Sequence, residues 1–218
     1  MKKYVNLFVF VFMVGACFSQ GKAQTKSAVS YKNPVVDIAM PDPTVIKAAD
    51  GYFYMYATES TRNVPIMKSK DLVQWTYCNT AFTNKTRPRF EPKAGIWAPD
   101  INYINNKYVL YYAMSVWGGE QTCGIGVATA DSPQGPFTDH GKMFRSNEIG
   151  VQNSIDPSFL QYEGRNYLVW GSFRGIYVIE LTEDGLSLKP GAEKKRIAGT
   201  AFEAAYICLL YTSPSPRD

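Results

Sequence analysis

The sequence has a single histidine and a low net charge, and each of these features argues against a class of function. His140 is the only histidine, so a Ser-His-Asp triad or a multi-histidine zinc site has almost no material from which to be built. We place His140 in a polar loop. The formal net charge is +4, and Lys2, Lys3 and Lys22 of a predicted signal segment supply most of it. The near-neutral remainder offers no electrostatic case for binding nucleic acid or an acidic membrane surface.

The chain has only four cysteines in 218 residues. Cys17 lies in the predicted signal and Cys208 at the start of an unusual tail. Cys78 and Cys123 could pair in an oxidising compartment, but two buried free thiols are the favoured interpretation. Neither cysteine has the spacing of a metal ligand, so no metal site is predicted.

The only long apolar run stands at the N-terminus, in MKKYVNLFVFVFMVGACFSQGKAQT. Two lysines, about twelve apolar residues and then small and polar residues indicate a secretion signal over residues 1–23. Two processing alternatives stay open: a lipobox ending at Cys17, or cleavage after Ala23. The expected location is secreted, periplasmic or on the outer surface of a bacterium as a lipoprotein.

Long helical periodicity is also missing, whereas aromatic residues make up 14% of the chain, which favours strands. Three segments align, beginning DPTVIKAADGYFYMYAT, DINYINNKYVLYYAMS and DPSFLQYEGRNYLVWGS. Each predicts two strands joined by a tight turn. The small residues that close the second strand, Ala57, Ala113 and Gly171, are 56 and 58 positions apart, so each repeat predicts one antiparallel sheet.

Each repeat continues with a third predicted strand, at VPIMKS, GIGVATA or GIYVIEL, and a short fourth one near Trp75, Phe137 or Leu186. Four strands at this period indicate an all-β fold of propeller blades around a central axis. A β-sandwich is the alternative, but the repeated order of turns favours the propeller.

One carboxylate heads the predicted innermost strand of each repeat, and a fourth begins the same pattern in FEAAYI. These acids are Asp42, Asp100, Asp156 and Glu203. If the blades share one axis, the four carboxylates converge on one mouth of the channel. Acids at strand starts can also cap turns, but four in the same register are better explained by function.

Converging carboxylates suit a hard cation or acid-base chemistry on a neutral substrate. The chain has no compact D-x-D-x-D loop of the kind that binds calcium. Hydrolysis of a glycosidic bond needs one protonated and one ionised carboxyl group, and crowding of like charges keeps one of them protonated near neutral pH.

The ordered set AMPDPTVI, GIWAPDI, NSIDPSF, WGSFRGIYVIEL and AFEAAYI resembles family 43 of the glycoside hydrolases, in particular its endo-1,5-α-L-arabinanase branch. The resemblance runs from about Asn33 to Ile207. It implies a five-bladed β-propeller and hydrolysis with inversion. It also implies that Asp42 is the general base, Glu203 the general acid, and Asp156 the residue that orients Glu203 and raises its pKa; Asp100 would have a structural role.

The resemblance further implies a set of substrate-binding residues: Asp42, Trp97, Gly118, Asn153, Ser154, Ile155, Asp156, Ser172, Phe173 and Arg174. Trp97 suits stacking on a sugar ring or a place in the core, and Phe173 and Arg174 suit packing and surface roles equally well. The expected partner is a plant cell-wall polysaccharide such as arabinan or another arabinose- or xylose-containing glycan, and a monomer is expected. No cofactor is needed for the chemistry, although the resemblance allows a structural calcium.

Three alternatives to an endo-arabinanase stay open. They are an exo-acting α-L-arabinofuranosidase or β-xylosidase of the same family, a propeller that binds sugar without cleaving it, and a propeller that binds no carbohydrate. Release of short oligosaccharides would favour endo action, and release of monomer alone would favour exo action.

Five blades of about 55 residues need on the order of 270 residues, so we expect residues 30–207 to form a partial propeller of little more than three blades. Residues 208–218, CLLYTSPSPRD, have no strand pattern and resemble translated vector sequence. Because an open propeller would leave an exposed edge, we expect residues 24–207 alone to be poorly stable and inactive.

Overall fold

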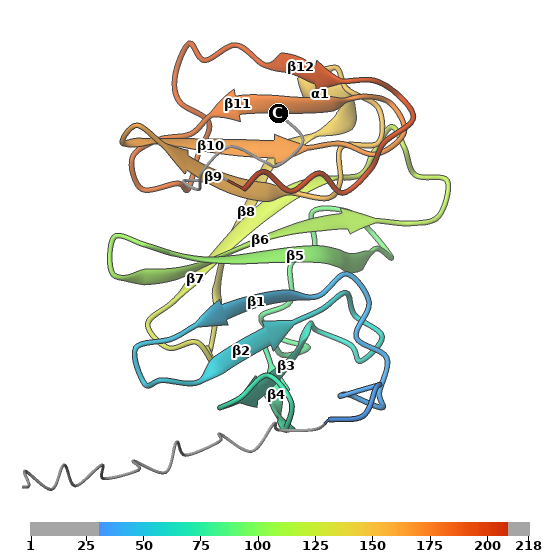
Figure 1. The fold of residues 1–218 in the computed structure, drawn as a ribbon. Coiled ribbons are helices and arrows are strands. Elements are labelled where there is room, and N and C mark those ends of the chain that lie inside the picture. The colour runs from blue at the N-terminus through green and yellow to red at the C-terminus, as the bar shows by residue number, and fades with distance from the viewer. Residues whose placement is uncertain (1–30, 209–218) are drawn as a thin grey trace, which may run out of the picture. The chain divides into compact units, whose positions relative to one another are not determined.

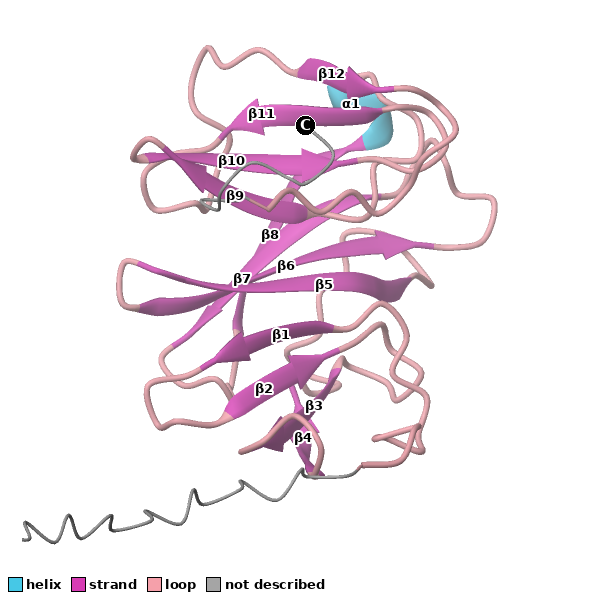
Figure 2. Cartoon of the chain, viewed as in Figure 1, coloured by secondary structure: helices cyan, strands magenta, loops and turns pink. Residues whose placement is uncertain are grey.

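The computed structural model describes residues 31–208. The predicted signal, both of its processing sites and residues 209–218 of the tail lie outside these residues. Figures 1 and 2 show that strands joined by loops make up the described chain, with almost no helix. The strands are β1 Thr44–Lys47, β2 Phe53–Tyr56, β3 Pro65–Ser69, β4 Trp75–Thr80, β5 Gly95–Ile104, β6 Lys107–Ser115, β7 Gly124–Ala130, β8 Thr138–Arg145, β9 Ser158–Tyr162, β10 Arg165–Trp170, β11 Ile176–Glu180 and β12 Lys195–Ala198, with one short helix, α1 Ser146–Ile149.

The twelve strands form three four-stranded sheets, β1 to β4, β5 to β8 and β9 to β12. Neighbouring strands in each sheet are consecutive in the chain and antiparallel. The first strands of the sheets, β1, β5 and β9, line one common cavity. This arrangement confirms the prediction of propeller blades and excludes the sandwich for the described residues.

Tight turns join the first two strands of every sheet where the sequence predicts them. Asn105 and Asn106 have φ of 47° and 63°, and Glu163 and Gly164 have φ of 49° and 72°. Left-handed backbone at both central positions matches the right-handed twist of the flanking strands. Asparagine and glycine tolerate this conformation best, so the local sequence sets the register of these hairpins.

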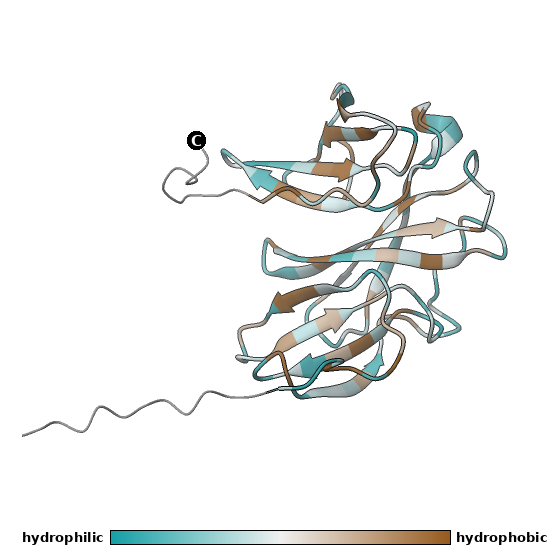
Figure 3. Ribbon diagram, turned by 45° about the vertical axis from the view of Figure 1, so that its right-hand side comes forward, coloured by the Kyte–Doolittle hydropathy of each residue, from teal (hydrophilic) through white to brown (hydrophobic). Residues whose placement is uncertain are grey.

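The middle sheet is covered on both faces, because the first and third sheets pack against it. Along β6, Leu110 and Tyr112 belong to the core shared with the first sheet, and Val109 and Tyr111 to the core shared with the third. Nearly every residue of β6 is therefore buried, as is typical of a strand with no solvent-facing side. Figure 3 shows apolar bands on strands of all three sheets.

Three local predictions are wrong. The fourth strand of the third sheet is not near Leu186 but at Lys195–Ala198. Leu186 and Leu188 instead pack from a loop into the core between the second and third sheets. His140 lies in β8 rather than in a loop, and its Nε2 is 2.8 Å from Thr129 Oγ1.

The third wrong prediction concerns Asp100, which does not stand at the start of its strand. β5 begins at Gly95, and a register shift between Trp97 and Asp100 interrupts its pairing with β6. Asp42 and Asp156, by contrast, stand two residues before β1 and β9 as predicted.

Cys78 and Cys123 are both free thiols, as the sequence favours. Cys123 is buried, and its Sγ is 3.2 Å from Ser146 Oγ. Cys78 is only half-buried, so it differs from prediction in its exposure.

Candidate active site

A cleft of about 610 Å³ contains three of the four predicted acids, Asp42, Asp156 and Glu203. Asp42 precedes β1, Asp156 precedes β9, and Glu203 follows β12. The tertiary structure therefore gathers carboxylates that are up to 161 positions apart in the sequence.

Asp42 is exposed, and a hydrogen bond orients its carboxylate. Thr58 Oγ1 donates a hydrogen bond to Asp42 Oδ2 over 2.6 Å. Thr58 Oγ1 also accepts a hydrogen bond from the Ala98 amide over 2.6 Å. The Thr58 amide in turn donates to the Pro41 carbonyl over 2.9 Å. Asp42 has φ of 49°, a left-handed conformation that non-glycine residues adopt only where the surroundings hold them.

Asp156 is the acid in the cleft whose protonation the fold changes most clearly. Burial, then the charge of Glu203 and then that of Asp42, together raise the pKa of Asp156 to about 7, against a hydrogen bond from the Ala204 backbone that lowers it. Desolvation and like charges both disfavour the ionised form. Asp156 can therefore hold a proton near neutral pH.

Glu203 is exposed and is held at the cleft by the connection between β10 and β11. Ser172 forms an isolated bridge with Glu203, and Ser172 Oγ donates to Glu203 Oε2 over 3.2 Å. The Phe173 amide donates to the Phe202 carbonyl over 2.9 Å. The predicted innermost strand after Glu203 is not formed in residues 203–208.

Most of the predicted substrate-binding residues line this cleft together with the acids. They are Trp97, Gly118, Asn153, Ile155, Ser172 and Phe173. Phe173 is 46% exposed, so its ring is accessible from solvent. Trp97 is half-buried and packs against Ile155 and Cys123, so it serves the core as well as the cleft wall.

Ser154 and Arg174 do not line the cleft. Ser154 is fully buried; its Oγ accepts a hydrogen bond from Trp170 Nε1 over 3.1 Å and donates to the Val151 carbonyl over 2.8 Å. Both hydrogen bonds of its hydroxyl are therefore made inside the protein. Arg174 donates to both carboxylate oxygens of Glu120, over 3.0 and 2.9 Å, and so braces a residue that does line the cleft.

Several residues of this cleft were not predicted from the sequence, and three of them have side chains suited to a functional role: Thr58, Trp117 and Glu120. Trp117 is 94% exposed, and its ring centroid lies 5.6 Å from that of Trp97. A tryptophan next to a Gly-Gly pair is a signal that could have been used, because such a loop presents its side chain to solvent. Thr58 and Glu120 carried no comparable signal.

Within residues 31–208, no group of three or more histidine, cysteine, aspartate or glutamate side chains is arranged to hold a metal ion. The same part of the chain has no helix long and apolar enough to cross a membrane. A structural calcium ion stays a prediction of the resemblance, and the proposed reaction does not use it.

Comparison with known families identifies the fold. The model of the glycosyl hydrolases family 43 matches residues 31–209. The chain belongs to this family. This match confirms the resemblance inferred from the motifs.

Individual relatives of this family 43 chain are arabinanases. An extracellular endo-α-(1→5)-L-arabinanase of Bacillus subtilis is 36% identical over 177 residues, which cover 75% of this chain and 54% of the relative. The structure of a Cellvibrio cellulosa α-L-arabinanase complexed with arabinohexaose has a TM-score of 0.65 at 28% identity and covers 74% of this chain and 54% of its own.

An exo-1,5-α-L-arabinanase from a bovine ruminal metagenomic library has a TM-score of 0.63 at 29% identity, with 78% of this chain and 58% of its own covered. The chain thus spans about half the length of the curated relatives it matches.

Proposed function

We propose that this chain belongs to a secreted enzyme that hydrolyses the α-1,5 linkages of arabinan with inversion. The observation that carries the proposal is the meeting of Asp42, Asp156 and Glu203 in one cleft. Relatives named as arabinan-cleaving enzymes, one of them complexed with arabinohexaose, support arabinan as the substrate.

In the proposed reaction, Asp42 acts as the general base. Its exposed carboxylate is oriented by Thr58, so it can take a proton from a water molecule that attacks the anomeric carbon. Glu203 acts as the general acid and gives a proton to the leaving oxygen. Inversion needs room for this water, with the two carboxyl groups about 6.5 to 9.5 Å apart.

Asp156 lies in the same cleft and positions Glu203. Because its pKa is raised to about 7, it can be protonated while the other two acids exchange protons with water and sugar. The charges of Asp156 and Glu203 repel each other, so these two carboxyl groups tend to hold one proton between them near neutral pH, and Glu203 needs that proton to act as the general acid.

The test uses the full-length protein on linear 1,5-arabinan. Glu203→Gln and Asp42→Asn should each lower kcat by about 10²- to 10⁴-fold, whereas Glu183→Gln, in an exposed turn of the third sheet, should change little. Wild-type turnover by Glu203→Gln would reject the acid assignment. NMR of the first product should show the inverted anomer.

Product size separates the endo proposal from the exo alternative, which the similarity to an exo-1,5-α-L-arabinanase keeps in view. Endo action releases short oligosaccharides early, and exo action releases one small product from the start. Binding of arabinan without any cleavage would instead support a carbohydrate-binding propeller.

We also propose export from a bacterial cell, supported by the extracellular names of two relatives and by the N-terminal sequence; the monomer stays a prediction. Lipid anchorage at Cys17 predicts that Cys17→Ala abolishes labelling with a fatty acid. Cleavage after Ala23 predicts no labelling of the parent and a mature chain that begins at Gln24.

A further inference from the structure

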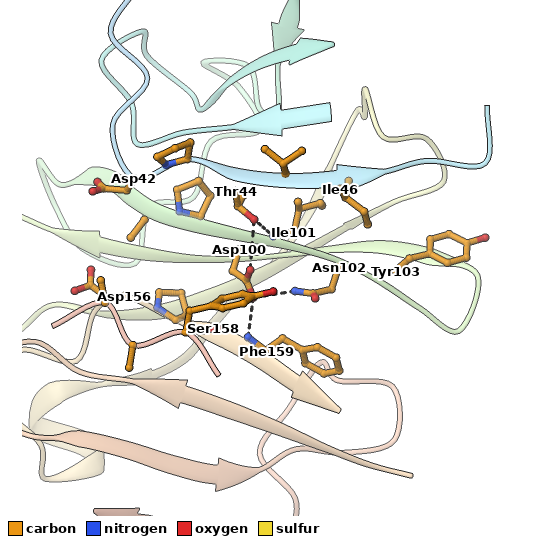
Figure 4. Close-up of a pocket in the computed structure, with 18 of the residues that line it drawn as sticks. Asp42, Thr44, Ile46, Asp100, Ile101, Asn102, Tyr103, Asp156, Ser158 and Phe159 are labelled. Carbon is orange, nitrogen blue, oxygen red and sulfur yellow. Dashed lines mark hydrogen bonds between the residues drawn. The ribbon is translucent and has the colours of Figure 1, made fainter. Parts of the chain in front are cut away.

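Asp100 is the one predicted acid outside the catalytic cleft. It lines a second cavity, of about 720 Å³, together with residues of β1, β5 and β9. Asp42 and Asp156 line this cavity as well as the cleft, and Figure 4 shows Asp100 between the strands that these two residues precede.

The carboxylate of Asp100 contacts all three innermost strands. Its Oδ2 accepts the Phe159 amide of β9 over 2.7 Å and Asn102 Nδ2 of its own strand over 2.9 Å. Its Oδ1 accepts the hydroxyl of Thr44 in β1 over 3.4 Å. The dashed lines in Figure 4 follow these contacts and a hydrogen bond from the Ile101 amide of β5 to Thr44 Oγ1 over 3.4 Å.

The two partners on other strands stand close to the acids of the cleft. Thr44 is two residues after Asp42, and Phe159 is three residues after Asp156. The strands β1 and β9 belong to different sheets from β5, so no ladder of backbone hydrogen bonds joins them to it. Asp42 and Asp156 also have left-handed φ of 49° and 57°, which persists only where neighbouring contacts hold it.

We propose that Asp100 is a positioning residue that sets the separation of Asp42 and Asp156 by tying β1 and β9 to β5. The proposal rests on the function proposed above for its effect on catalysis, but the geometry can be tested without substrate. Asp100 itself touches no substrate in this scheme and acts only through the two strands.

The charge state of Asp100 decides how these links are made. Burial raises its pKa to about 6, against the hydrogen bonds that it accepts. The other titratable groups that face it are Tyr111 of β6 and, around the cavity, Asp42, Lys47, Tyr103, Asp156 and Tyr206. When protonated, Asp100 can still accept the Phe159 amide through one oxygen and donate to Thr44 through the other.

Three variants of the full-length protein should differ in kcat. Asp100→Ala removes both links, so kcat on linear arabinan should fall on the order of 10- to 100-fold with little change in KM, because misplaced groups impair the transition state more than binding. Asp100→Asn can keep both links through its oxygen and amide and should retain most of kcat at pH 5. Asn102→Ala is the matched control, since it removes a contact to the same oxygen but no link between strands, and it should retain kcat.

A readout that needs no substrate is the titration of the Asp156 carboxyl carbon by NMR. Its midpoint depends on the distances to Glu203 and Asp42, so Asp100→Ala should shift it and Asn102→Ala should not. Inactivity of the parent would reject the proposed function while this titration still tests the positioning. If Asp100→Ala does not fold, Thr44→Val, which removes the link from Asp100 to β1 and also the hydrogen bond from the Ile101 amide to Thr44 Oγ1, should shift the midpoint in its place.

The proposal is overturned if Asp100→Ala keeps parental kcat and the parental Asp156 midpoint. It is also overturned if Asp100→Asn folds but loses as much kcat at pH 5 as Asp100→Ala, because the charge and not the links would then matter. For Thr44→Val, an unshifted midpoint counts against the proposal.

Discussion

Replacement of Asp156 by asparagine should make the protein less sensitive to pH. The fold raises the pKa of Asp156 from 3.8 to about 7, so the folded state holds this proton more tightly than the unfolded state. The resulting stability is fully present below about pH 4 and is lost as the pH rises through 7. At about 1.36 kcal/mol per pKa unit, the loss is at most about 4 kcal/mol.

Asparagine resembles the protonated aspartate and does not ionise, so Asp156→Asn should escape this loss. The free energy of unfolding, measured with urea at pH 4, 6 and 8, should be similar for parent and variant at pH 4. At pH 8 the variant should be the more stable of the two, by up to about 4 kcal/mol.

Asp184→Asn is the control, because hydrogen bonds from Thr182 and the Leu186 amide lower the pKa of Asp184. A lowered pKa gives stability that is present above the ordinary pKa and lost in acid, so this variant should lose stability at pH 8. A difference between parent and Asp156→Asn that stays constant from pH 4 to pH 8 would refute the electrostatic reasoning.

Three further predictions concern packing and the cleft wall. Arg87→Met should lower the free energy of unfolding by about 3 to 5 kcal/mol in urea titrations, because it leaves the buried carboxylate of Glu59 without its ion-pair partner; a loss below 1 kcal/mol would contradict this. Gly126→Ala should cost about 1 to 3 kcal/mol in the same assay, because its new Cβ would lie 2.4 Å from the Tyr112 ring, whereas Gly199→Ala, the control, has open space around the Cβ and should change little. Trp117→Ala should raise KM for arabinan oligosaccharides and leave the melting temperature unchanged, since the side chain is 94% exposed; an unchanged KM would remove Trp117 from the proposed sugar-binding surface.

The blade pattern could be predicted from sequence because its causes are local. Turn residues with left-handed φ, such as Asn105 and Asn106, and strands rich in aromatic and β-branched residues set each hairpin without reference to the rest of the fold. The places of Asp42 and Asp156, two residues before β1 and β9, also follow from the repeat, whereas Asp100 lies inside β5.

The failures occurred where distant parts of the chain compete. The fourth strand of the third sheet was misplaced because Leu186 and Leu188 look like strand residues but are taken into a core made by two sheets. Ser154 was expected to contact substrate because of the family resemblance, yet Trp170, sixteen residues later, donates a hydrogen bond to its hydroxyl in the interior.

The sequence by itself determined most of the strands, the turns of the first hairpins, and that Asp42 and Asp156 stand before β1 and β9, because propensity and spacing act over a few residues. Only the tertiary structure decided which acids share the cleft, that Asp100 contacts three strands from a separate cavity, and that Asp156 has a pKa of about 7. Desolvation and the repulsion of like charges depend on distances between groups far apart in the chain, and such distances exist only once the sheets have packed around their common axis.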